Sequence, residues 1–143
     1  MVDKNKHLTA SLNLVNDRLL LEGIVEGNTP IAIDYIPPLG DNLGYTSLEL
    51  MLLSLSSCVA TALLVLLRRQ GKNIMSFSIK SEGTRRQTHP TAFEEIHLFI
   101  NIQSSDLTSG EYEKALSMVE SVCPVWYMIK GSTQVVFHHQ ITV

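Results

Sequence analysis

Residues 46–71 read TSLELMLLSLSSCVATALLVLLRRQG and contain the longest uncharged stretch of the chain. Thr46 and Glu49 stand at the spacing of a capping box, the pattern in which two side chains satisfy each other's backbone N–H groups at a helix start. Gly71 is typical of the position just after a helix end, where the backbone turns left-handed. The stretch therefore predicts one long helix over residues 47–70.

The interior of this helix, Leu50 to Leu67, carries no formal charge and is close to the shortest length that spans a membrane. Small and polar side chains nevertheless recur along one face at helical spacing, while leucines occupy another face. Amphipathic strand patterns on both sides indicate that one domain forms around the helix. We therefore expect a helix buried in a protein core and no membrane, and a membrane-anchored subunit is the alternative. The face with small side chains consists of Ser54, Ser57, Cys58, Thr61 and Val65.

The composition is that of a packed globular protein. The chain has 143 residues, of which 45% are hydrophobic and 17% charged, so a single domain over residues 1–143 is expected. The formal net charge is -3, from 11 basic and 14 acidic residues, and no basic stripe is present to neutralise a row of phosphates. We therefore expect no nucleic acid partner. Two cysteines and a polar N-terminus without an apolar signal segment indicate the reducing cytoplasm.

Strand and helix patterns alternate around the long helix. Alternating apolar and polar residues predict strands, and they occupy residues 8–14, 19–25, 31–35, 75–80, 95–103 and 134–141. The first two runs are expected to form a hairpin. A second capping box, Thr108 with Glu111, begins another helix, which Pro124 breaks. The expected fold is α+β, an antiparallel sheet covered by a long central helix and a second, broken helix.

The two cysteines, Cys58 and Cys123, are the most informative candidates for chemistry. A thiolate attacks peroxides and disulfides, whereas a neutral thiol does not, so a reactive cysteine needs a cation, a hydrogen-bond donor or a helix N-terminus nearby. Cys123 precedes Pro124 at an expected helix start, which predicts that it has the more acidic thiol. If the broken helix packs on the face of small side chains, the two sulfurs come within disulfide reach. The alternative is that both are ordinary buried cysteines.

Other kinds of site find little support in the sequence. The five histidines show neither an HExxH motif nor a pair at helical i, i+4 spacing, and the cysteines form no CxxC motif. A phosphate-binding glycine loop, a nucleophile elbow and a dinucleotide fingerprint are also missing from the sequence. We therefore expect neither a metal nor an organic cofactor.

Four segments in register resemble the OsmC/Ohr proteins, and they are Gly44 to Cys58, Gly83 to Phe93, Ile96 to Ile102 and Val122 to Val125. The resemblance implies an OsmC-like fold, an intertwined homodimer and a peroxidase with two redox cysteines. In such proteins the cysteine that matches Cys58 attacks a hydroperoxide and becomes a sulfenic acid. The cysteine that matches Cys123 then condenses with it to a disulfide. A dithiol reductant restores both thiols.

The organic hydroperoxide resistance branch of this family activates its thiolate with a glutamate paired to an arginine from the N-terminal strands. Glu49 and Arg18 are the candidates for these catalytic roles. Counting back from Cys58 puts the glutamate position on Leu48, one residue and about 100° of helix rotation before Glu49. Arg18 stands beside the turn signal Asn16-Asp17. The chain therefore resembles the OsmC-like branch more closely.

The residues and the resemblance together lead to two candidate functions. The first is a cytoplasmic, homodimeric peroxidase that reduces organic hydroperoxides to alcohols through Cys58 and Cys123, with an apolar lining expected from leucine and methionine side chains, Trp126 and Tyr127. The second is a non-enzymatic OsmC-like dimer that binds an apolar small molecule and in which both cysteines are structural. Titration of the thiols separates the two functions, because only the peroxidase requires a thiolate at neutral pH.

Overall fold

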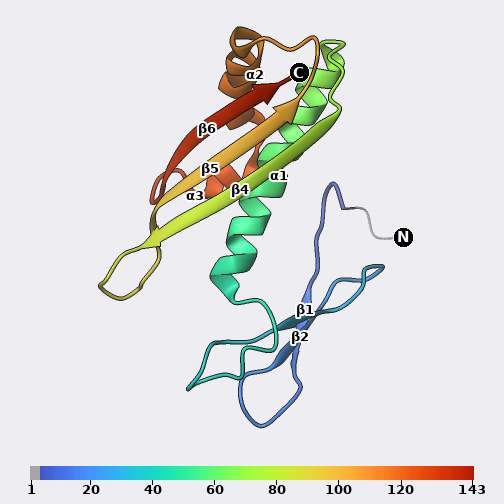
Figure 1. Ribbon diagram of the computed structural model, residues 1–143. Helices are drawn as coiled ribbons and strands as arrows, with labels where there is room; N and C mark the ends of the chain where they lie inside the picture. The colour runs from blue at the N-terminus through green and yellow to red at the C-terminus, as the bar shows by residue number, and fades with distance from the viewer. Residues whose placement is uncertain (1–3) are drawn as a thin grey trace. The chain divides into compact units, whose positions relative to one another are not determined.

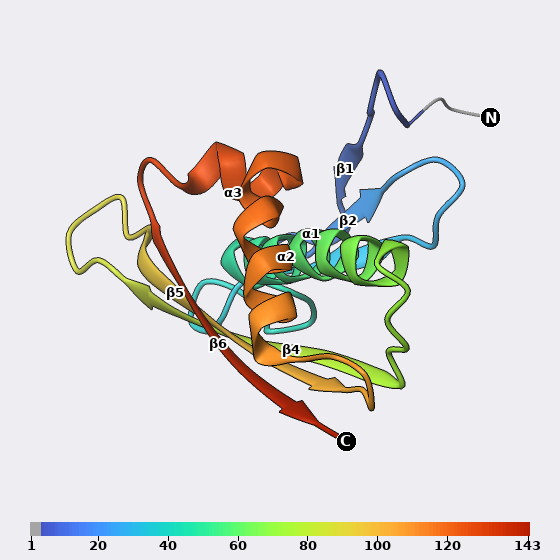
Figure 2. The ribbon, with the colours of Figure 1, turned by 90° about the horizontal axis from the view of Figure 1, so that it is seen from above.

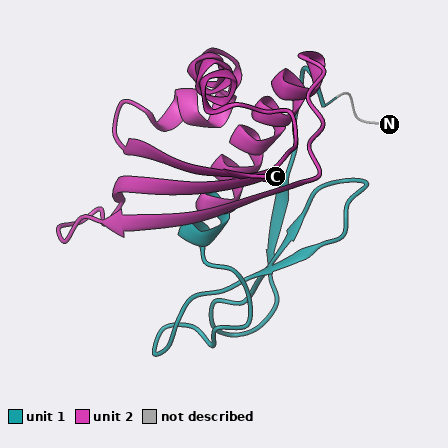
Figure 3. Cartoon of the chain, turned by 45° about the horizontal axis from the view of Figure 1, so that its top comes forward, with its two compact units in different colours: residues 1–51 teal, residues 52–143 magenta. Residues whose placement is uncertain are grey.

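The computed structural model describes residues 4–143. The chain divides into two compact units, Met1–Met51 and Leu52–Val143, drawn in teal and magenta in Figure 3. The prediction of one domain over residues 1–143 stays a prediction.

The N-terminal unit is a small antiparallel sheet. Its strands are β1 (Ser11–Leu14), β2 (Leu21–Ile24) and β3 (Ile31–Ile33), in the order β1-β2-β3. The predicted hairpin is confirmed, with shorter strands than expected, because the Asn16 side chain accepts hydrogen bonds from the backbone N–H groups of Arg18 (2.9 Å) and Leu20 (3.1 Å) and closes the turn. The large apolar side chains of this sheet stay exposed, for example Leu12 at 55% and Leu14 at 60%. The described residues of the unit therefore enclose no apolar core of their own.

Helix α1 (Ser47–Arg69) begins and ends within a residue of its predicted limits. At its start the Thr46 N–H donates to the Glu49 carboxylate (2.9 Å) and the Glu49 N–H donates to the Thr46 hydroxyl (3.3 Å), so the predicted capping box is formed. Gly71 adopts a φ of 78° and donates to the Arg68 carbonyl (3.0 Å). That left-handed conformation favours glycine and explains the stop.

The C-terminal unit is a second sheet with helices on one of its faces (Figures 1 and 2). Its strands are β4 (Ser76–Arg85), β5 (Phe93–Gln103) and β6 (Gln134–Thr142), and α2 (Ser109–Val122) and α3 (Pro124–Ile129) lie between β5 and β6 in the sequence. One side of β5 faces the helices. The β5 side chains buried on that side are Ile96, Leu98, Ile100 and Ile102. The helices contribute Leu55, Val59, Leu63, Leu67, Tyr112, Ala115 and Val119 to the same core. The predicted α+β architecture is confirmed.

One pairing differs from the expected antiparallel sheet. β4 and β5 are antiparallel, but β5 and β6 run parallel, with Leu98 opposite Phe137. Parallel neighbours require a crossover connection. Helices α2 and α3 provide this crossover, because they carry the chain from the end of β5 back to the level at which β5 begins (Figure 2).

Within residues 4–143, α1 is the only helix that is long and apolar enough to cross a membrane, with a mean hydropathy of 2.4 over its most apolar window. The core helix of a soluble protein meets the same criterion, so the finding is weak evidence for a membrane span. In the single chain, 22% of that window is buried. Much of the apolar surface of α1 is therefore left uncovered by this one chain.

Candidate functional site

The structure brings the two cysteines together. Cys58 lies on α1 and Cys123 lies at the junction of α2 and α3, 65 positions later, and the Cys123 thiol donates a hydrogen bond to the Cys58 sulfur with an Sγ–Sγ distance of 2.8 Å. Both are free thiols; Cys58 is half-buried and Cys123 is buried. The sequence predicted that the two sulfurs come within disulfide reach if the broken helix packs beside the small side chains of α1. In the C-terminal unit the helices pack in this way.

Local sequence explains how Cys123 is held. Its N–H donates to the Val119 carbonyl (2.8 Å) as the last bond of α2, and its carbonyl accepts from the Tyr127 N–H (3.0 Å) in the first turn of α3. Pro124 has no N–H to continue α2 and suits the first position of a new helix. Cys123 is thus held by backbone hydrogen bonds to both α2 and α3, and its side chain reaches the Cys58 sulfur on α1.

Burial governs the protonation of Cys123. The side chain is 1% exposed, and burial together with the hydrogen bond to Cys58 raises the pKa of Cys123 to about 11, although the backbone N–H groups of Trp126 and Val125 act in the opposite direction. The expectation that the helix start acidifies Cys123 is therefore wrong, because desolvation disfavours the charged form more strongly than the helix start favours it. At neutral pH Cys123 is a protonated hydrogen-bond donor.

A pocket of about 430 Å³ opens beside Cys58. One wall is α1, which contributes Cys58, Ala62 and Leu66, and the other wall is formed by Val122 and Pro124. A mostly apolar pocket of this size, with one reactive group in its wall, is typical of sites for small organic molecules.

A second depression, of about 690 Å³, is bordered by Cys123 and shares Val122 and Pro124 with the first pocket. Tyr127 lines this depression, and Lys130 lies over its ring (5.3 Å to the centroid) and pairs with Glu120 (3.0 Å). The Trp126 ring packs against Phe137, with 4.9 Å between ring centroids. Trp126 and Tyr127 were expected to line one apolar pocket, but the Trp126 ring packs against Phe137 whereas Tyr127 lines the second depression.

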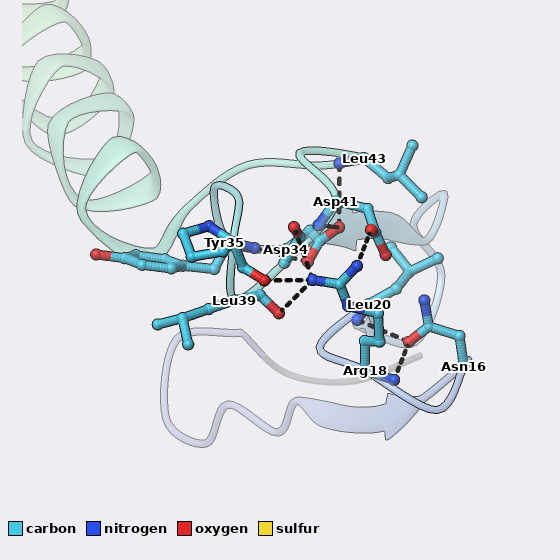
Figure 4. A network of polar contacts seen from close by, with 10 residues as sticks. Asn16, Arg18, Leu20, Asp34, Tyr35, Leu39, Asp41 and Leu43 are labelled. Carbon is cyan, nitrogen blue, oxygen red and sulfur yellow. Dashed lines mark hydrogen bonds and ion pairs between the residues drawn. The ribbon is translucent and has the colours of Figure 1, made fainter.

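Arg18 holds the loop that follows β3 in the N-terminal unit (Figure 4). Its guanidinium pairs with the Asp41 carboxylate (2.6 Å) and donates to three carbonyl groups of that loop, at Pro38 (2.5 Å), Leu39 (3.1 Å) and Gly40 (3.3 Å). Within residues 4–143 the guanidinium makes its contacts to this loop, so Arg18 holds the loop in place within its own unit.

The same loop surrounds Asp34, a buried carboxylate that sequence reasoning missed. Asp34 accepts from the backbone N–H groups of Tyr35 (2.7 Å), Asp41 (3.2 Å) and Leu43 (3.1 Å). Burial raises the pKa of Asp34, but these three donors and the Arg18 charge outweigh it, so the pKa lies below its ordinary value. An aspartate that directly follows a strand and precedes a proline-containing loop is a sequence pattern that predicts hydrogen bonds from the loop backbone to the aspartate carboxylate.

Glu49 completes the capping box of α1. Its carboxylate accepts from the backbone and side chain of Thr46, and these bonds lower the pKa of Glu49. In the described part of the chain no ion pair joins Glu49 to Arg18. Neither is there a group of three or more His, Cys, Asp or Glu side chains within residues 4–143 that could hold a metal ion.

Comparisons with known proteins agree on the fold. The family model described as OsmC-like protein matches residues 40–138. The structure of an OsmC-like protein from Mycoplasma pneumoniae is similar with a TM-score of 0.84 and 17% identity, covering 97% of this chain and 99% of the other. The structure of an organic hydroperoxide resistance protein from Elizabethkingia anophelis is similar with a TM-score of 0.74 and 18% identity, covering 98% of this chain and 99% of the other. For an organic hydroperoxide resistance protein from Legionella pneumophila the TM-score is 0.69 and the identity 18%, covering 96% of this chain and 97% of the other. No curated protein sequence matches significantly.

Proposed function

Because the chain belongs to the family of OsmC-like proteins, we propose that it is a thiol-dependent peroxidase that reduces organic hydroperoxides to alcohols. The observation that carries the proposal is the pair of sulfurs, 2.8 Å apart, beside an apolar pocket. Two thiols at this distance can be oxidised to a disulfide with only small side-chain movements. Organic hydroperoxide resistance proteins with this fold support the same activity.

In the proposed reaction the Cys58 thiolate attacks the terminal oxygen of the hydroperoxide. The O–O bond breaks, the alkoxide takes a proton and leaves as the alcohol, and Cys58 becomes a sulfenic acid. The Cys123 sulfur then attacks the Cys58 sulfur, the S–O bond breaks, and hydroxide leaves as water. A dithiol reductant reduces the disulfide by two thiol exchanges and is itself oxidised to a disulfide.

The protonated state of Cys123 suits the resolving role. Its S–H donates to the Cys58 sulfur, and a donor at this position stabilises negative charge there. After the sulfenic acid has formed, the same proton is in place for transfer to the departing hydroxide. Because a neutral thiol is a poor nucleophile, Cys123 does not compete with Cys58 for the hydroperoxide, and it attacks the sulfenic sulfur as its proton passes to the departing hydroxide.

A homodimer would cover the apolar surface that one chain leaves exposed. The N-terminal sheet presents Leu12, Leu14 and Val15 at 55%, 60% and 58% exposure, and most of the apolar window of α1 is likewise unburied. Large apolar side chains left exposed in this number mark an interaction surface on a soluble protein. We therefore include homodimer formation in the proposal, together with a cytoplasmic, non-membrane location and a role in oxidative stress.

A specific observation favours the second function, a non-enzymatic dimer that binds an apolar molecule. Arg18 is engaged by Asp41 and the following loop, and Glu49 by the capping box, so the pair that activates the thiolate in the hydroperoxide resistance branch is not joined within this chain. In that case Cys58 would react with peroxides no faster than free cysteine.

The test is hydroperoxide consumption with dithiothreitol as the dithiol and cumene hydroperoxide as the substrate. We expect Cys58→Ser to abolish turnover. In the absence of dithiothreitol, Cys123→Ser should consume one equivalent of hydroperoxide and stop at a Cys58 sulfenic acid, which dimedone traps and mass spectrometry identifies. Wild-type protein treated with one equivalent of hydroperoxide should contain a Cys58–Cys123 disulfide. Full activity in Cys58→Ser would contradict the peroxidase and leave the binding function.

A further inference from the structure

Two histidines meet on the face of the C-terminal sheet that points away from its helices. The helices cover one face of the sheet (Figure 2), and because side chains alternate along β5, Ile96 and Leu98 enter the core whereas His97 lies on the other face. His138 of β6 lies diagonally across from His97, since the parallel register sets His97 opposite Val136. The His97 Nδ1 and His138 Nε2 atoms are 2.8 Å apart. Two imidazole nitrogens from neighbouring strands therefore converge outside the core.

Glu95 decides which nitrogen of His97 is free to bind an ion. Its carboxylate lies 2.9 Å from Nε2, the nitrogen of His97 that does not contact His138. An ionised carboxylate accepts hydrogen bonds and donates none, so Nε2 carries the proton and Nδ1 keeps a lone pair. A metal-bound histidine commonly donates its second N–H to a carboxylate in this way, which fixes the tautomer and the orientation of the ring.

His138 supplies the second lone pair. Since His97 Nδ1 is an acceptor, the 2.8 Å contact is a hydrogen bond donated by His138 Nε2. The Phe99 ring orients the His138 ring by stacking on it, with centroids 4.6 Å apart and 10° between the planes, while His138 stays exposed and free to pivot. In the other neutral tautomer of His138 the proton is on Nδ1, and an ion between the two rings then meets two imidazole lone pairs.

We propose that His97 and His138 form a surface site for a divalent transition-metal ion, with Cu²⁺ bound most tightly. Imidazole suits Cu²⁺, Ni²⁺ and Zn²⁺, and affinity at a given site is highest for Cu²⁺, whereas Ca²⁺ and Mg²⁺ require oxygen ligands. At a metal–nitrogen distance of about 2.0 Å, two nitrogens at a right angle are about 2.8 Å apart, but a tetrahedral zinc site separates them by about 3.3 Å. The observed separation of 2.8 Å thus fits the tetragonal geometry of Cu²⁺ and Ni²⁺.

Two protein ligands make the bound ion exchangeable. Within residues 4–143 no group of three or more His, Cys, Asp or Glu side chains forms a metal site, so water completes the coordination. Glu82, opposite His97 in the β4–β5 pairing, is paired with Lys80 (2.8 Å) and adds negative charge nearby. The site lies on the face of the sheet opposite to the helices, one of which carries Cys58, and is independent of the proposed peroxidase.

Calorimetry with Ni²⁺ tests the site, because Ni²⁺ does not oxidise the two thiols. The variants are His97→Gln, His138→Gln, Glu95→Gln and the matched control His139→Gln, in which the changed side chain belongs to the opposite face of β6, where it stacks on Tyr112. We expect wild type to bind one Ni²⁺ per chain at this site. Loss of either ligand should weaken binding roughly 100-fold, and Glu95→Gln, which leaves both ligands in place, roughly tenfold. The control should bind as wild type does.

A spectroscopic arm identifies the donor atoms. Cu²⁺ is added to Cys58→Ser protein, in which the ion cannot oxidise the cysteine pair to a disulfide. Electron paramagnetic resonance should show hyperfine coupling to two nitrogens, and His138→Gln should abolish this pattern. Absence of saturable Ni²⁺ binding by wild type, equal affinity in His97→Gln, or an equal loss in His139→Gln would overturn the inference. Turnover of hydroperoxide by Cys58 is decided by its own assay and is unaffected by these outcomes.

Discussion

The pKa of Cys123 makes the stability of the reduced protein dependent on pH in the alkaline range. Burial and the Cys58 hydrogen bond raise the pKa from its ordinary value of 9.0 to about 11. In the unfolded chain the thiol loses its proton near pH 9, whereas in the folded protein it keeps the proton until about pH 11. Its contribution to stability is therefore complete below pH 9 and is lost as the pH rises to 11.

The size of the effect follows from the shift. A difference of one pKa unit corresponds to about 1.4 kcal/mol, so the two states differ by about 2 to 3 kcal/mol in their affinity for this proton. Removal of the thiol in Cys123→Ala removes this dependence. The difference in free energy of unfolding between wild type and Cys123→Ala should thus fall by about 2 to 3 kcal/mol between pH 8 and pH 11.

The assay is urea denaturation of both proteins at matched concentration in a phosphine reductant, at half-unit steps from pH 7.5 to 11. Tyr112 also has a raised pKa, to about 12, because of its burial, but it is present in both proteins and cancels in the comparison. Parallel stability curves over the whole range would refute the reasoning, because they would mean that Cys123 titrates as it does in an unfolded chain.

Two further predictions concern single residues that support the fold. Glu111 pairs with Lys72 (2.7 Å) and caps α2, and these bonds lower the pKa of Glu111 to about 2. The stabilisation that the Glu111 carboxylate provides is therefore present above about pH 4.5 and is lost as the pH falls toward 2. The thermal unfolding temperature of Glu111→Gln should differ from that of wild type at pH 6 and converge with it near pH 2. Gly44→Ala would place a methyl group 2.3 Å from the Ala32 carbonyl oxygen, a backbone atom that cannot move aside freely, and should cost about 1 to 3 kcal/mol. Hydrogen exchange confined to the N-terminal sheet would reveal this loss, and unchanged protection there would contradict it.

Local patterns predicted the helices well because the interactions that limit them are made between near neighbours. The capping boxes Thr46–Glu49 and Thr108–Glu111 are formed as expected. Gly71 and Pro124 end their helices for reasons that belong to the individual residues, a left-handed φ and a missing N–H. Each of these features can be recognised within four or five consecutive residues.

The pairing of the last strand and the partners of Arg18 could not be predicted in this way. Alternation along β6 indicates a strand but not its direction, which depends on the path of α2 and α3 across the sheet. Arg18 was matched to Glu49 by resemblance, and the structure pairs it with Asp41 because the loop after β3 folds back over the hairpin turn. Both outcomes depend on contacts between segments far apart along the chain.

In the candidate site, too, some features depend on short segments of sequence and others on contacts between distant segments. Residue types and spacing identified Cys58 and Cys123 and the helices that carry them, since thiol chemistry and helix periodicity are properties of short segments. The distance of 2.8 Å between the sulfurs and the high pKa of Cys123 arise from packing. Desolvation and proximity depend on which distant segments surround a group, and no local pattern of residues records them.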